Sequence, residues 1–197
     1  MDSSLINLLL FRAGIETCRM AVGDNLLHNP LAADLMRLNK SFVVERDLAS
    51  ARAGYRAMTR TSHYVRHSLQ EHASVWIAQR QGRAKDGFDR TDPALIKMLA
   101  LAYRKQAEPI RELLSNGALV PVSLSYEVDP CAPAKARELA ALARDGEYAK
   151  GEQEDLDSMI QGLVGYKGQV HVHFSPPIAQ DCDCLLYTSD AADETVR

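Results

Sequence analysis

The sequence is poor in the residues that would indicate a metal centre or a disulfide framework. It has four cysteines in 197 residues. Cys18 and Cys131 are isolated, while Cys182 and Cys184 form a C-x-C whose spacing matches no paired zinc motif. The pattern predicts no metal site, and it favours the reducing environment of the cytoplasm.

Long apolar runs are also missing. The leucine-rich stretch at residues 5–11 contains Asn7 and falls far short of the ~18 apolar residues that span a bilayer. The first residues lack the basic and apolar regions of a secretory signal. Any membrane contact would therefore be peripheral, at the inner face of the cell membrane. The net charge of -3 argues against a generally basic nucleic-acid binder, so we expect no nucleic-acid partner.

The residues that are present indicate one α/β domain at 1–183. Hydrophobic residues make up 46% of the chain, enough for one substantial core. Strand and helix patterns alternate, which predicts a mixed, largely parallel sheet flanked by helices. The expected helices are residues 2–13, which we interpret as buried, 31–38, 51–70, 93–105, 108–115, 133–144 and 156–163. The expected strands are residues 18–22, 41–45, 74–79, 118–126 and 168–174.

The predicted helix at 51–70 carries two stripes about 140° apart. The stripe that we expect to face inward comprises Tyr55, Met58, Ser62, Val65 and Leu69. The opposite stripe is basic and comprises Arg52, Arg56, Arg60, His63 and His67. The i, i+4 spacing of the two histidines would suit a metal, but an exposed, solvated face is the favoured interpretation.

Four segments resemble, in order and spacing, the blocks of the glycerol-3-phosphate and 1-acyl-glycerol-3-phosphate (lysophosphatidate) acyltransferase family, in a bacterial branch. They are Gly-Asp-Asn-Leu-Leu (23–27), Leu-Met-Arg-Leu-Asn-Lys-Ser-Phe-Val-Val-Glu-Arg (35–46), Val-Trp-Ile-Ala-Gln-Arg-Gln-Gly-Arg-Ala-Lys-Asp-Gly (75–87) and Val-Pro-Val-Ser-Leu-Ser-Tyr-Glu (120–127). The resemblance extends over residues 2–178 and implies the α/β fold of glycerolipid acyltransferases. It also implies transfer of a fatty acyl group from acyl-CoA or acyl-carrier protein to glycerol-3-phosphate or lysophosphatidate, without a metal or bound cofactor.

The family's first block pairs a histidine base with an aspartate a few residues later. Asp2 matches the aspartate, and the histidine would lie before Met1, so we expect a chain truncated at its N-terminus and nearly inactive. In isolation, Asp2 is more simply a carboxylate at a helix N-terminus. Arg46 matches the arginine that holds the acceptor's phosphate. Without the resemblance, a surface salt bridge to Glu45 or Asp47 would explain Arg46 equally well.

The third block normally contains a Glu-Gly pair followed by basic residues. Here Gln81 stands in place of the glutamate and Gly82 follows it, with Arg80, Arg83 and Lys85 around them as candidates for substrate binding. The simpler interpretation of this charge run is a solvated loop. The fourth block places Pro121 in an apolar strand, where the resemblance implies a role in shaping the acyl or acceptor pocket.

Two other interpretations compete with the acyltransferase. A non-enzymatic anion- or lipid-binding α/β module would use the basic stripe and loop as its surface. A phosphate-ester hydrolase or kinase would need a metal-binding carboxylate cluster or a phosphate loop, and the sequence shows neither motif. Residues 184–194 resemble the translation of a sequencing-library adapter, so we expect an artefactual disordered tail at 184–197, with a natural disordered tail as the alternative.

Overall fold

The computed structural model describes residues 2–24, 30–45, 49–79, 92–117, 119–149, 151 and 154–178. The helices are α1 (Asp2–Arg12), α2 (Pro30–Leu38), α3 (Ala51–Gln70), α4 (Pro93–Ala100), the 3-10 turn η2 (Leu101–Tyr103), α5 (Pro109–Asn116), α6 (Ala132–Asp145) and α7 (Glu154–Val164). The strands are β1 (Arg19–Gly23), β2 (Ser41–Val44), β3 (Val75–Trp76), β4 (Val122–Tyr126) and β5 (Val170–Phe174). Each helix and strand expected from the sequence has a counterpart, which confirms the α/β class.

The strands form two sheets among the described residues, where the sequence suggested one. Strands β2, β1 and β3 lie side by side in that order, and both pairings are parallel. Strands β4 and β5 pair only with each other and are antiparallel, with Leu124 opposite Val172. A strand pattern states which face is apolar but does not name the neighbouring strand. The division into two sheets therefore emerges only in three dimensions.

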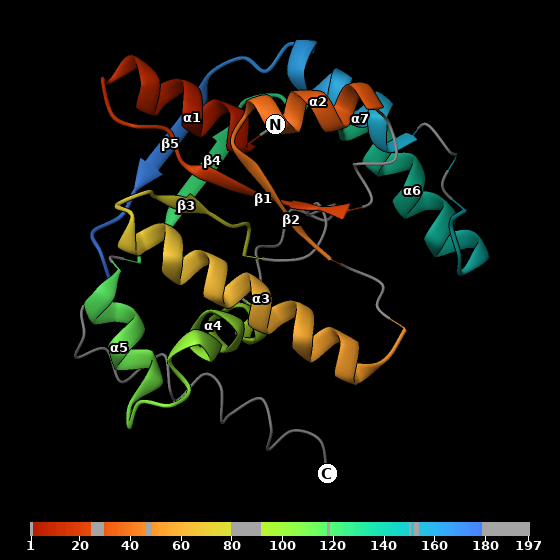
Figure 1. The fold of residues 1–197 in the computed structure, drawn as a ribbon. Helices are drawn as coiled ribbons and strands as arrows, with labels where there is room; N and C mark the ends of the chain where they lie inside the picture. The colour runs from red at the N-terminus through yellow and green to blue at the C-terminus, as the bar shows by residue number, and fades with distance from the viewer. Residues whose placement is uncertain are drawn as a thin grey trace.

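The crossovers place helices on both faces of the parallel sheet. Helix α2 connects β1 to β2, and α3 connects β2 to β3 on the far side of β1. Because these two connections step across the sheet in opposite directions, the right-handed crossover rule sends their helices to opposite faces. Figure 1 shows this arrangement, with α1 and α2 on one side of the sheet and α3 on the other.

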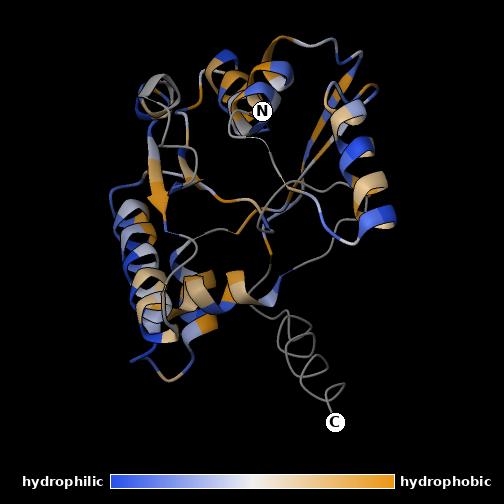
Figure 2. Ribbon diagram, turned by 90° about the vertical axis from the view of Figure 1, so that its right-hand side faces the viewer, coloured by the Kyte–Doolittle hydropathy of each residue, from blue (hydrophilic) through white to orange (hydrophobic). Residues whose placement is uncertain are grey.

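The main hydrophobic core lies between α3, α4, η2 and α5. It contains Val65, Met98, Leu99, Ala102, Tyr103 and Leu113, with Phe42 and Val75 of the sheet packed against it. Figure 2 shows hydrophobic residues gathered on these helices. The fully buried Ser62 joins α3 to the next helices, because its Oγ donates to the carbonyl of Leu99 (3.0 Å) and accepts from the amide of Ala102 (2.7 Å).

Both predicted helix caps are present. Ser50 accepts a hydrogen bond from the amide of Ala53 (3.2 Å) at the start of α3. Asp92 accepts one from the amide of Ala94 (2.9 Å) at the start of α4. These side chains satisfy amides that the first helical turn leaves without intrahelical partners. The sequence signal at these two helix starts was therefore correct.

Two predictions about which residues are buried were wrong. Helix α1 is not buried as a whole, since Ile6 and Asn7 are covered but Phe11 is 73% exposed. In α3 the inward stripe begins later than expected, and Tyr55 and Met58 are 45% and 42% exposed. Tyr55 lies at the edge of the core, where its hydroxyl accepts a hydrogen bond from Arg104 (2.6 Å). The periodicity of the sequence identified the inward face of α3, but the length of that face that other helices bury depends on how they pack against it.

Candidate functional site

The strand order β2-β1-β3 places the topological switch of the parallel sheet between the carboxyl ends of β1 and β3. The chain leaves β1 at Gly23 toward α2 and leaves β2 at Val44 toward α3, on opposite faces of the sheet. In open α/β sheets, ligands bind in the crevice that such a divergence leaves at the carboxyl ends of the strands. This end of the sheet is therefore the position at which the fold favours a binding site.

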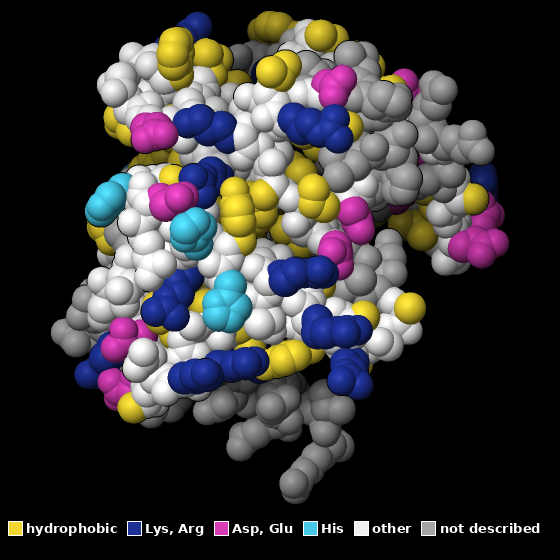
Figure 3. All heavy atoms as spheres, in the orientation of Figure 1, with side chains coloured by type: hydrophobic (Ala, Val, Ile, Leu, Met, Phe, Trp, Pro, Cys, Tyr) yellow, Lys and Arg dark blue, Asp and Glu magenta, His cyan; other side chains and the backbone are white. Residues whose placement is uncertain are grey.

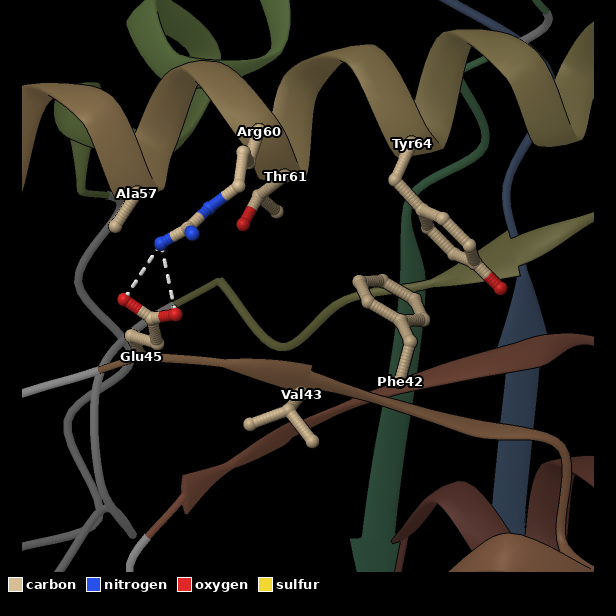
Figure 4. Close-up of a pocket in the computed structure, with 7 residues that line it drawn as sticks. All are labelled: Phe42, Val43, Glu45, Ala57, Arg60, Thr61 and Tyr64. Atoms are coloured by element: carbon tan, nitrogen blue, oxygen red, sulfur yellow. Dashed lines mark hydrogen bonds and ion pairs between the residues drawn. The ribbon is translucent and has the colours of Figure 1, made fainter.

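A small open pocket of about 170 Å³ lies between β2 and α3, and its lining includes Val43 and Glu45 at the carboxyl end of β2. Figure 4 shows its lining, with Phe42 and Tyr64 at one end and Glu45 and Arg60 at the other. The two rings are 4.7 Å apart between centroids and tilted by 40°. One guanidinium nitrogen of Arg60 donates to both carboxylate oxygens of Glu45 at 2.8 Å. The pocket thus combines an aromatic end with a charged end.

Asp2 lies at the N-terminus of α1 and is held by a residue distant in sequence. The hydroxyl of Tyr126, the last residue of β4, donates a 2.6 Å hydrogen bond to its Oδ1. Burial raises the pKa of Tyr126, and the hydrogen bond to Asp2 and the negative charge of that carboxylate raise it further. Tyr126 therefore remains a hydrogen-bond donor through the neutral range, and it fixes one oxygen of the carboxylate.

The orientation of α1 depends on the buried side chain of Asn7. Its Oδ1 accepts from the amide of Cys18 (2.9 Å), and its Nδ2 donates to the carbonyl of Cys18 (3.2 Å). The same Nδ2 donates to Oδ1 of Asn39 in the turn before β2 (3.1 Å). One amide thereby joins the helix that carries Asp2 to the beginning of β1 and to the approach to β2.

The predicted site residues divide into one described position and a set outside the described residues. Asp2 is described, and its predicted setting at a helix start is confirmed. Arg46, Arg80, Gln81, Gly82, Arg83 and Lys85 lie outside the described residues. Arg46 directly follows Glu45 at the end of β2, and the set from Arg80 onward follows Gln79, three residues after β3.

The described residues contain no group of three or more histidine, cysteine, aspartate or glutamate side chains placed to hold a metal ion. In this part of the chain, none of the helices is both long and apolar enough to cross a membrane. The polar groups described in this region act through hydrogen bonding and charge. They include the Asp2 carboxylate, the Tyr126 hydroxyl and the Arg60–Glu45 pair.

Comparison with known families finds no match, and no curated protein matches the chain. The acyltransferase interpretation accordingly rests on the order and spacing of the four segments and on where their described parts lie.

Three residues of this region were missed by the sequence reasoning. Tyr126 stood within the fourth segment but was given no role, and Asn7 was noted only as a polar interruption of an apolar run. Arg60 was assigned to an exposed stripe, with no link to Glu45. A tyrosine that ends a strand and an asparagine inside an apolar helix are the signals that could have singled out the first two. Nothing in the sequence signals the third, because Arg60 and Glu45 meet only when α3 folds back over β2.

Proposed function

We propose that this chain is part of an acyltransferase of the glycerol-phosphate type. Its reaction is the transfer of a fatty acyl group from an acyl thioester, on coenzyme A or an acyl-carrier protein, to the hydroxyl of glycerol-3-phosphate or lysophosphatidate. We also propose that its α/β fold is that of the glycerolipid acyltransferases.

The observation that supports it is the position of the family-like segments at the ends of strands. The segments at 23–27 and 35–46 begin or end at the carboxyl ends of β1 and β2, and the one at 75–87 begins with β3. Because these strands are parallel, the three segments run to the same end of one sheet. The fourth segment, at 120–127, spans β4 and carries Tyr126, which contacts Asp2 of the first block. The parallel strand ends and the Tyr126–Asp2 contact support the proposal.

The proposed chemistry assigns a role to each group. The histidine that the family carries shortly before its aspartate takes the proton from the acceptor hydroxyl, and Asp2 orients that imidazole. Arg46 binds the acceptor's phosphate through its guanidinium. The resulting alkoxide oxygen adds to the thioester carbon, and the tetrahedral oxyanion then collapses with cleavage of the carbon–sulfur bond, while the departing thiolate takes up the proton from the imidazole. Hydrogen-bond donors near the carbonyl would stabilise the intermediate oxyanion.

The third family block, at 75–87, supplies the remaining contacts in this proposal. Arg80, Arg83 and Lys85 would neutralise phosphate groups of the donor or acceptor. Gln81 keeps the shape of the family's glutamate but not its charge, and Gly82 leaves room for close approach of a ligand to the backbone. The proposed substrate contacts therefore combine Arg46, which follows β2, with basic residues that follow β3 in the sequence.

The test measures free thiol released from an acyl-CoA, with and without glycerol-3-phosphate. The chain as given is compared with a longer chain that carries the family's histidine before Asp2. We expect transfer in the longer chain only, because a positioned general base contributes ~10² to 10⁴-fold. Equal activity in both chains would contradict the assigned base. Failure of the longer chain with both acceptors and with acyl-carrier protein as donor would favour the binding-module alternative.

Arg46→Ala in the longer chain tests the phosphate contact. We expect a higher KM for the acceptor with a smaller change in kcat, because the contact is present both before and during the reaction. Arg144→Ala is the matched control, since Arg144 is an exposed arginine paired with the adjacent Asp145 on α6. If the two variants behave alike, Arg46 has no specific role.

A further inference from the structure

The outward face of α3 is a strip of basic side chains with no acidic residue in the helix. The helix spans 20 residues and contains four arginines and two histidines but no aspartate or glutamate. Five of these side chains, named here the α3 stripe, are Arg52, Arg56, Arg60, His63 and His67. At 100° and 1.5 Å per residue they fall within an arc of about 80° and extend over about 22 Å. Figure 3 shows dark-blue and cyan side chains gathered over α3 on this face.

Part of the stripe is neutralised and part is not. Arg60 is paired with Glu45 at 2.8 Å, and His67 lies 3.3 Å from Glu71. Arg52, Arg56 and His63 are exposed and form no hydrogen bond or ion pair with the described residues. A chain with a net charge of -3 thus carries a basic face on one helix, where Arg52 and Arg56 have no acidic partner among the described residues. Such a face attracts an anionic partner.

The side chains that flank the stripe indicate what kind of partner this is. The stripe itself contains no apolar residue that could enter a bilayer, whereas interfacial membrane helices combine basic and apolar faces. Tyr55 and Tyr64 lie on either side of the stripe and are 45% and 37% exposed. Tyrosine and arginine are among the residue types enriched in protein interfaces. A protein partner therefore fits this surface better than a lipid surface does.

The spacing of the stripe matches a helix in the partner. Side chains at i and i+4 lie about 6 Å apart on a helix surface, so a second helix with acidic residues at that spacing can lie along α3 and oppose its cations. We propose that the α3 stripe is a docking surface for an acidic helix of a partner protein. This inference does not depend on the proposed acyltransferase activity, because it concerns binding alone.

The test uses a synthetic, fluorescently labelled helical peptide of about 20 residues with glutamate at i, i+4 spacing along one face. Its binding to the full chain is followed by fluorescence anisotropy, at low salt and at about 0.5 M salt, where charges are screened. One control peptide has glutamine in place of every glutamate. The second has the same composition in an order that spreads the glutamates around the helix. We expect binding of the first peptide only, and weaker binding at high salt.

Three variants locate the binding surface. The triple variant Arg52→Gln/Arg56→Gln/His63→Gln should weaken peptide binding at least tenfold. Arg111→Gln/Arg144→Gln removes exposed charges on other helices. This variant should change the affinity for the peptide by no more than about twofold, because solvent and salt screen distant charges. Glu45→Gln should tighten binding, since it removes the carboxylate that pairs with Arg60 among the described residues and adds a free cation to the stripe. A gain in affinity cannot result from misfolding.

The proposal is overturned if the spread-glutamate peptide binds equally well, because net charge alone would then explain binding. It is also overturned if the triple variant and the Arg111→Gln/Arg144→Gln variant lose affinity equally. Vesicles of phosphatidylcholine with about one-third phosphatidylglycerol provide the last arm of the test. Stripe-dependent vesicle binding without peptide binding would replace the protein partner by a membrane surface.

Discussion

The hydroxyl of Tyr126 donates a 2.6 Å hydrogen bond to the carboxylate of Asp2, although the two residues lie 124 positions apart in the chain. The bond joins the end of β4 to the beginning of α1, and so connects the antiparallel pair of strands to the helix that lies against the parallel sheet. Because the acceptor is a carboxylate, the bond belongs to the stronger, charge-assisted class.

We expect Tyr126→Phe to lower the free energy of unfolding by about 1 kcal/mol. This is below the usual contribution of a hydrogen bond to a charged group, because the tyrosine retains contact with water. A double-mutant cycle with Asp2→Asn, measured by urea unfolding, isolates the interaction. Independent, additive effects of the two substitutions would show that the bond contributes nothing to stability.

The raised pKa of Tyr126 predicts a specific dependence of stability on pH. Burial is the main cause, with the hydrogen bond and the charge of Asp2 adding to it. The folded protein therefore holds this proton to higher pH than the unfolded chain, whose tyrosines titrate near ~10. The stabilising contribution is fully present below that value and is lost as the pH rises further. Between pH ~9 and ~11, the native chain should lose more unfolding free energy than Tyr126→Phe. Parallel stability curves would contradict this.

Ser62→Ala should destabilise the protein by about 1–3 kcal/mol, because it leaves the amide of Ala102 and the carbonyl of Leu99 without their buried partner. The matched control is Ser115→Ala, since the hydroxyl of Ser115 is exposed and donates only to Arg111 in its own helix (2.8 Å). That change should cost less than about 0.5 kcal/mol. Thermal unfolding of both variants measures the difference, and equal losses would mean that the Ser62 bridge is not important.

Two glycines should respond to alanine in opposite directions. Gly168 has φ of +62°, and an added Cβ would approach the Cβ of Glu127 to 2.8 Å, so Gly168→Ala should destabilise by about 1–2 kcal/mol. Gly54 lies within α3 with nothing within 4 Å of an added Cβ, so Gly54→Ala should stabilise by up to about 1 kcal/mol. Denaturant midpoints test both expectations, and a stabilised Gly168→Ala would contradict the geometry assigned to the turn before β5.

Local signals in the sequence predicted the helices and strands well. Pro93 after Asp92 located the start of α4, and Ser50 located the start of α3, because helix caps depend on a few neighbouring residues. The alternation of Val170 and Val172 located β5. These features need no knowledge of the rest of the fold, so the sequence alone carries them.

Contacts between distant segments could not be predicted in this way. The pairing of β4 with β5 and the Arg60–Glu45 pair both depend on how elements pack after they form. The partner of Asp2 was missed for the same reason. The resemblance assigned Asp2 a histidine partner, whereas its hydrogen-bond donor among the described residues is Tyr126, contributed by a strand more than 100 positions away.

Because Asn7 anchors α1 near its middle, a tilt of this helix about Asn7 moves its N-terminal residue, Asp2. Asn7 is the buried fulcrum, and Asp2 lies five residues away, or about 7.5 Å along the axis, so a tilt of about 10° at the anchor would displace the carboxylate by about 1.3 Å. Displacements of about 1 Å are large enough to reduce reaction rates about 10²-fold where a catalytic group must be aligned. The position of the Asp2 carboxylate is therefore fixed by two contacts, the hydrogen bonds of Asn7 within α1 and the hydrogen bond from Tyr126 to the carboxylate itself. A displacement of α1 at one of these contacts is limited by the other contact.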